Sequence, residues 1–186
     1  LRVVATPRCN LQCAYCHAEG DPPGGVTHAL PFEVLVRILL TAVAAGVRKL
    51  KFLGGEPLLR ADLPDVVRAV RAVAPDLDVS VITAGVVPVE RLDALVDAGL
   101  SRVNMSIHGF FPDALARRIP TPRAHVIRER FLARVLEHGR PLKLNYVWGS
   151  RLDDADLAGL LRWAEGRPLV VNVLDDLRRD LGPDAI

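Results

Sequence analysis

The chain has 186 residues, of which 50% are hydrophobic and 25% are charged. At roughly 150 residues per domain, this length predicts a single domain over residues 1–186, and the composition excludes an intrinsically disordered or fibrous protein. The formal net charge is +2, with 24 basic against 22 acidic residues. That balance, without a long basic run, gives no signal for binding nucleic acid or a membrane surface.

No stretch of 18 apolar residues occurs, so the sequence predicts no membrane span. The first residues lack a basic segment followed by an apolar one, so no secretory signal is visible and we expect a cytoplasmic protein. All three cysteines lie between Cys9 and Cys16. An odd number packed so tightly is not a secreted disulfide framework, and it favours metal ligation.

The order of predicted elements is an alternation of strands and helices. Strands are expected at 2–6, 49–53, 78–83, 102–107, 142–147 and 169–174. Helices are expected at 32–43 and after Asp62, Val89, Arg123 and Asp153. The Gly- and Pro-rich stretches 20–25 and 112–122 are expected to be long loops.

This alternation predicts an α/β fold built from parallel βα units. Two architectures fit it: an open doubly wound sheet, or a complete or partial (β/α) barrel. Both place a functional site at the carboxyl ends of the strands.

The strongest chemical signal is Cys9-x3-Cys13-x2-Cys16, directly after the first predicted strand. Three sulfur ligands suit an iron-sulfur cluster or zinc, and three rather than four leave one coordination position open. The alternatives are a structural zinc completed by His17 and inert buried cysteines.

A second motif, Gly54-Gly55-Glu56-Pro57, follows the second predicted strand. Two glycines allow a ligand to approach the backbone closely, and Glu56 can accept hydrogen bonds from an ammonium group. The segment lies one βα unit beyond the cysteines, so both motifs are expected at the same edge of the sheet.

Together these motifs resemble the radical S-adenosylmethionine (SAM) superfamily, and within it the molybdenum-cofactor GTP cyclases and their MoaA-like relatives. The resemblance covers residues 1 to about 145. It implies a partial (β/α)6 TIM-like barrel in which Cys9, Cys13 and Cys16 hold a 4Fe-4S cluster whose fourth iron is chelated by SAM. Further implied cofactor contacts are Tyr15 near the adenine, Gly54, Gly55 and Glu56 at the methionyl amino group, and Thr83, Ser106, Lys143 and Asn145 on later strands.

The resemblance also implies the reaction. One electron from the reduced cluster cleaves SAM, and the resulting 5'-deoxyadenosyl radical abstracts hydrogen from a small-molecule or peptide substrate. A low-potential donor such as flavodoxin or ferredoxin is implied.

The chain departs from the cyclases at several positions. It has no cysteine beyond Cys16, whereas the cyclases hold a second cluster with three C-terminal cysteines. It has Thr83-Ala84-Gly85 and Ser106-Ile107-His108 where the family has Thr-Asn-Gly and Ser-Leu-Asp, and it stops soon after the sixth strand. Two alternatives therefore stay open: a non-catalytic scaffold that binds SAM and iron-sulfur, and the core of a longer cyclase or peptide-maturing enzyme.

The only three lysines, Lys49, Lys51 and Lys143, all lie in predicted strands. A lysine inside a barrel needs an anion to offset its desolvation, so we expect Lys49 and Lys51 to bind a carboxylate or phosphate of the substrate. The alternative is that they emerge into solvent at the strand starts. His108 is a candidate proton donor or acceptor near the substrate, although a histidine at a strand end is as often structural.

Overall fold

The computed structural model describes residues 1–13, 28–149 and 153–175. Its strands are β1 (Arg2–Thr6), β2 (Lys49–Gly54), β3 (Asp78–Thr83), β4 (Arg102–Ile107), β5 (Leu142–Trp148) and β6 (Leu169–Asp175). Its helices are α1 (Phe32–Ala44), α2 (Leu63–Val73), α3 (Glu90–Asp97), α4 (Pro112–Arg118), α5 (Ala124–Glu137) and α6 (Asp154–Ala164), with a short 3-10 helix η1 (Pro57–Leu59).

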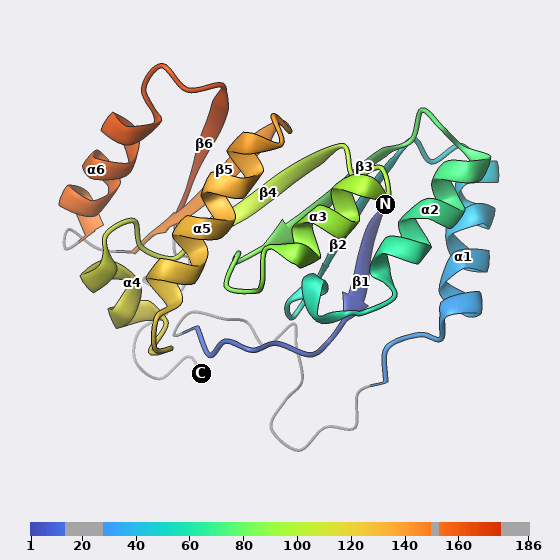
Figure 1. Cartoon of the computed structure of the whole chain (residues 1–186), viewed down its shortest axis with the longest axis horizontal. Helices are drawn as coiled ribbons and strands as arrows, with labels where there is room; N and C mark the ends of the chain where they lie inside the picture. The colour runs from blue at the N-terminus through green and yellow to red at the C-terminus, as the bar shows by residue number, and fades with distance from the viewer. Residues whose placement is uncertain (14–27, 150–152, 176–186) are drawn as a thin grey trace.

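The six strands form one sheet in the order β1-β2-β3-β4-β5-β6, and every neighbouring pair is parallel. A doubly wound sheet reverses its strand order part-way, so the sequential order decides between the two predicted architectures. The helices lie along one face of the curved sheet (Figure 1). The predicted partial (β/α)6 barrel is therefore confirmed.

Alternation along each strand separates two faces. Residues such as Phe52, Val81 and Met105 pack with helix residues such as Leu39 and Val66 in the main core. The strand residues between them face away from the helices, because successive side chains in a strand point to opposite sides. That second face is the interior of the partial barrel.

The predicted loop at 112–122 was wrong in part, because residues Pro112–Arg118 form helix α4. Pro112 occupies the first turn, where its missing N–H costs nothing, and Ala114 and Leu115 are buried. The helix has seven residues, too few for a visible apolar period. The other expected loop, 20–25, lies outside the described residues. Within the described ranges, no helix is long and apolar enough to cross a membrane.

Candidate active site

The cysteine segment leaves the end of β1 and is anchored across the top of the sheet. The side-chain amide of Asn10 donates to the carbonyl of Val86 at 2.8 Å. Leu11 is buried in a small apolar cluster with Ala84 and Leu115, and Cys13 packs against that cluster. Cys9 is exposed and Cys13 is half-buried. The segment therefore runs from β1 toward the carboxyl ends of β3 and β4, while Tyr15 and Cys16 lie outside the described residues.

The two glycines after β2 fit against the backbone that leads into the cysteines. A Cβ on Gly54 would lie 2.1 Å from the carbonyl oxygen of Thr6, and one on Gly55 would lie 2.4 Å from that of Arg8. The amide of Gly55 donates to Thr6 at 3.0 Å, and that of Glu56 donates to Arg8 at 2.8 Å. Glycine is thus required at both positions because the backbone leading into the cysteine segment packs directly against them.

Gly55→Ala is expected to destabilise the protein by about 3 kcal/mol or more, because backbone atoms on the opposing segment cannot move aside as a side chain would. Gly139→Ala is the matched control: nothing lies within 4 Å of its added Cβ, and only its left-handed φ of +60° opposes the change. That control should cost about 1 kcal/mol. Urea unfolding of both variants measures the difference, and equal losses would contradict the steric account.

Glu56 lies at the centre of this turn, with 2% of its surface exposed. Its carboxylate accepts hydrogen bonds from the backbone amides of Leu58 (3.1 Å) and Ala84 (3.0 Å) and from the hydroxyl of Thr83 (2.9 Å to each oxygen). The Thr83 hydroxyl in turn accepts from the amide of Gly85 at 2.9 Å. Glu56 therefore joins the carboxyl ends of β2 and β3.

The Glu56 carboxylate is buried among hydrogen-bond donors and not beside a basic side chain of the described residues. Burial raises its pKa above the ordinary value, although the bonds from Ala84, Leu58 and Thr83 oppose that shift. No lysine or arginine in the described ranges forms an ion pair with it. A buried carboxylate in such a place favours an incoming cation.

His108 follows β4 directly and is 8% exposed. Burial, together with the nearby positive charges of Arg118 and Arg128, lowers its pKa to about 4. The imidazole is therefore neutral at physiological pH. A neutral ring has one nitrogen that donates and one that accepts, so the chemistry predicted for His108 remains open to it.

The backbone after His108 is held by residues that the sequence did not single out. The carboxylate of Asp156 on α6 accepts from the amides of Phe110 and Phe111, at 2.7 Å each, and Arg128 on α5 donates to the carbonyl of Phe110 at 2.7 Å. Asp156 lies in the first turn of α6 and is 3% exposed, and sequence spacing alone carries no signal for such a contact.

A row of cationic side chains, Arg2, Lys51, Arg102 and Lys143, lies on the inner face of the sheet and is called the cationic row below. Arg2, Lys51, Ser80 and Arg102 are register partners across β1 to β4. Burial lowers the pKa of Lys51, and repulsion from Arg102, Lys143 and Arg2 lowers it further, while Asp78 opposes the shift. Asp78 pairs with Arg102 at 3.0 Å. Among the described residues, Lys51 therefore feels the charges of three other cationic side chains and of the Asp78 carboxylate.

The remaining predicted site residues lie either at the start of β2 or toward the carboxyl ends of the strands. Lys49 is exposed at the start of β2, opposite Asp78, where the solvent alternative would place it. Ser106, Asn145 and Asn172 are register partners across β4 to β6, and Asn172 donates to Asn145 at 3.2 Å. These residues lie nearer the carboxyl ends than Lys51 does, so the interior changes from cationic to neutral and polar along the strands.

Comparison with known proteins decides the family. The model of the radical SAM superfamily matches residues 3–164. The chain belongs to the radical SAM superfamily. It is also 32% identical over 176 residues to a probable GTP 3',8-cyclase from Methanocella arvoryzae, covering 94% of this chain and 56% of the relative.

Solved structures carry the same fold. Streptococcus suis SuiB bound to S-adenosylmethionine superposes with a TM-score of 0.78 at 16% identity, covering 94% of this chain and 40% of SuiB. SuiB bound to its precursor peptide SuiA gives 0.75 at 17% identity, covering 94% and 38%. The chain spans about half the length of the curated relatives it matches.

The predictions of family, fold and cofactors are thereby confirmed, because the chain is a member of the radical SAM superfamily. The chain's residues fit the 4Fe-4S cluster and SAM. Two of the three thiol side chains start from the segment that Gly55 and Glu56 bind, and the buried Glu56 carboxylate beside it suits the ammonium of SAM.

Proposed function

We propose that this chain forms the core of a radical SAM enzyme that removes a hydrogen atom from an anionic substrate. When bound, the reduced cluster and SAM supply a 5'-deoxyadenosyl radical for that step. The observation that carries the proposal is the contact between the cysteine segment and the turn holding Glu56, which brings thiol ligands and a buried carboxylate to one edge of the sheet.

We assign a separate role to each candidate residue. Cys9, Cys13 and Cys16 ligate the cluster, and Glu56, with Thr83 holding its carboxylate, accepts the methionyl ammonium of SAM. Ser106 and Asn145, which lie on the inner face toward the carboxyl ends of β4 and β5, are assigned to SAM, and Tyr15 is assigned to the adenine. We assign to neutral His108 the role of holding or passing a proton at its ring nitrogens.

The cationic row supports an anionic substrate. Lys51 and Lys143 lie on the inner face, nearer the amino ends of the strands than the turn that carries Glu56, and the charges of Arg2 and Arg102 act on Lys51. An anion bound there would relieve the mutual repulsion of these cations. A small phosphate- or carboxylate-bearing molecule, with GTP as the first to test, and an acidic peptide both suit the row; Lys49 stays a substrate-binding prediction.

We expect the wild-type protein to bind inorganic tripolyphosphate, and Lys51→Met to weaken that binding about tenfold because one cation of the row is lost. Isothermal titration calorimetry measures both affinities. Arg68→Met on α2 is the control, since its side chain is more than half exposed and pairs only locally with Asp65. Equal affinities for wild type and Lys51→Met would remove Lys51 from the substrate site.

The proposal also includes a flavodoxin or ferredoxin as electron donor, a single core domain over residues 1–186, and a cytoplasmic location. Its test is anaerobic reconstitution with iron and sulfide, reduction with dithionite, and measurement of 5'-deoxyadenosine formed from SAM. Formation of the nucleoside supports the enzyme. Stoichiometric SAM binding without 5'-deoxyadenosine would favour the non-catalytic scaffold instead.

A further inference from the structure

Strand β1 contains an irregularity just before the cysteine segment. Val4 is the register partner of Leu53, yet Thr6 is the partner of Gly54, so β1 has one residue more than β2 over this stretch. The hydrogen bonds show the same shift. The amide of Lys51 donates to Leu1, and a regular ladder would pair the amide of Gly55 with Ala5, but Gly55 donates to Thr6.

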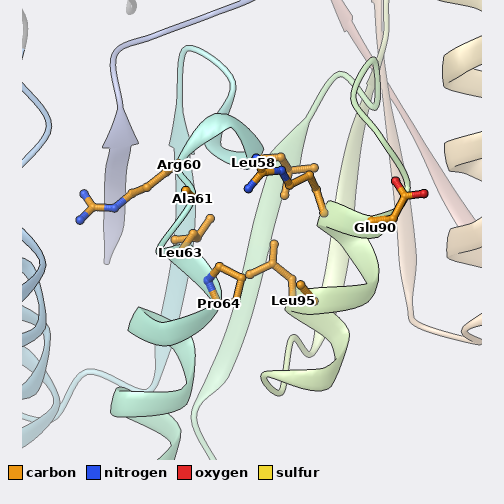
Figure 2. Close-up of a pocket in the computed structure, with 9 residues that line it drawn as sticks. Leu58, Arg60, Ala61, Leu63, Pro64, Glu90 and Leu95 are labelled. Atoms are coloured by element: carbon orange, nitrogen blue, oxygen red, sulfur yellow. The ribbon is translucent and has the colours of Figure 1, made fainter.

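The extra residue is a β-bulge at Ala5, and it leaves the carbonyl of Ala5 without its regular ladder donor. Ala5 is completely buried, so water cannot replace that donor. The guanidinium of Arg60 donates to the Ala5 carbonyl at 3.0 Å. Figure 2 shows the Arg60 side chain extending from the segment after η1 toward β1, away from Pro64 and Leu95.

Arg60 is itself held in place. Its Nε donates to one carboxylate oxygen of Asp62 at 2.7 Å, and its Nη2 donates to the other at 3.1 Å. This two-point contact fixes the plane of the guanidinium and leaves Nη1 for Ala5. Arg60 is 8% exposed, so the side chain is committed to these partners.

The bulge determines which residues of the cysteine segment face the turn after β2. Because β1 gains one residue at Ala5, the Thr6 carbonyl accepts from the amide of Gly55 and the Arg8 carbonyl accepts from that of Glu56, and Cys9 follows Arg8 directly. Without the bulge, each of these acceptors would be shifted by one residue along the chain. The start of the cysteine segment would then be offset relative to the Glu56 carboxylate.

We propose that Arg60, oriented by Asp62, is a positioning residue: it stabilises the Ala5 bulge and so sets the register between the cysteine segment and the Glu56 turn. This inference rests on the proposed function, since the register matters because it aligns the cluster ligands with the SAM site. Arg60 touches neither group, and it acts through the backbone.

The first test uses the protein without iron. In Arg60→Met, hydrogen exchange at the amides of Gly55 and Glu56 should be at least about tenfold faster, because their acceptors, the carbonyls of Thr6 and Arg8, are no longer held in register. Arg60→Lys keeps a donor and should stay near wild type. Arg68→Met is the control for losing an arginine. Asp62→Asn is the second variant, for use if Arg60→Met does not fold. Its side chain is more exposed than that of Arg60, so we expect a smaller increase in exchange at the same two amides.

The second test uses the reconstituted, reduced cluster and its electron paramagnetic resonance spectrum with and without SAM. Arg60→Met should retain most of its iron but bind SAM about tenfold more weakly, a factor that corresponds to about 1.4 kcal/mol. Arg60→Lys should restore the response to SAM. A purely structural role would lower thermal stability in Arg60→Met and leave SAM affinity unchanged.

The outcomes separate the two claims. Exchange at Gly55 and Glu56 that is unchanged in both Arg60→Met and Asp62→Asn would overturn only the claim that Arg60 stabilises the Ala5 bulge. Wild-type SAM affinity in Arg60→Met, or failure of Arg60→Lys to restore it, would overturn the positioning role. A wild-type protein whose spectrum does not respond to SAM would overturn the proposed function, and with it the role of Arg60 toward SAM.

Discussion

Cys13→Ala is expected to abolish both the iron-sulfur cluster and the formation of 5'-deoxyadenosine. A 4Fe-4S cluster with one open iron already has its minimum of three protein ligands, so no spare thiol replaces the lost one. The chain has no cysteine outside this segment. Iron analysis and the visible absorbance of the reconstituted protein measure the loss.

The fold of Cys13→Ala should survive. Cys13 is half-buried at the edge of a small apolar cluster, and alanine keeps its Cβ, so unfolding of the iron-free variant should resemble that of the wild type. Thr41→Ala on α1 is a surface control, since its hydroxyl bonds only within its own helix. Full iron content in Cys13→Ala would show that the ligand assignment is wrong.

Glu56→Gln is expected to weaken SAM binding at least about tenfold while the cluster is retained, because the amide cannot provide the negative charge that an ammonium requires. Glu33→Gln, exposed in the first turn of α1, is the matched control. Equilibrium binding of SAM to the reconstituted proteins measures the effect. Unchanged affinity in Glu56→Gln would remove Glu56 from the SAM site.

The raised pKa of Glu56 adds a pH signature. Burial favours the protonated form, so the contribution of Glu56 to the stability of the unliganded protein is present below the carboxyl's ordinary pKa and is lost as pH rises through the raised one. SAM binding needs the ionised form and should strengthen over that same rise. Glu56→Gln should remove both trends, and a wild-type SAM affinity independent of pH across that range would contradict this assignment.

Periodicity and motif spacing predicted the strands almost residue by residue. Strands β1, β3 and β4 match the predicted bounds, and β2, β5 and β6 extend one residue further. Burial of alternate residues on one face is a strong local signal, and it was sufficient for the parallel βα alternation. The choice between a barrel and a doubly wound sheet required the strand order, which depends on long-range packing.

The site was less predictable because its key contacts join distant segments. The spacing of Gly54, Gly55 and Glu56 indicated a ligand site, but the closest backbone to the glycines is the cysteine segment. The bulge at Ala5 and its partner Arg60 left no trace in composition or period. Such contacts depend on which carbonyl remains unpaired after the sheet has formed, and a sequence does not display that.

The most direct measurement of the central claim is electron-nuclear double resonance on the reduced, reconstituted protein with SAM labelled with nitrogen-15 at its amino group. The account predicts a hyperfine coupling between the cluster and the label in the wild type. It also predicts loss of that coupling at the same SAM concentration in Glu56→Gln. A cluster that forms in the wild type but shows no coupling to bound, labelled SAM would contradict the account.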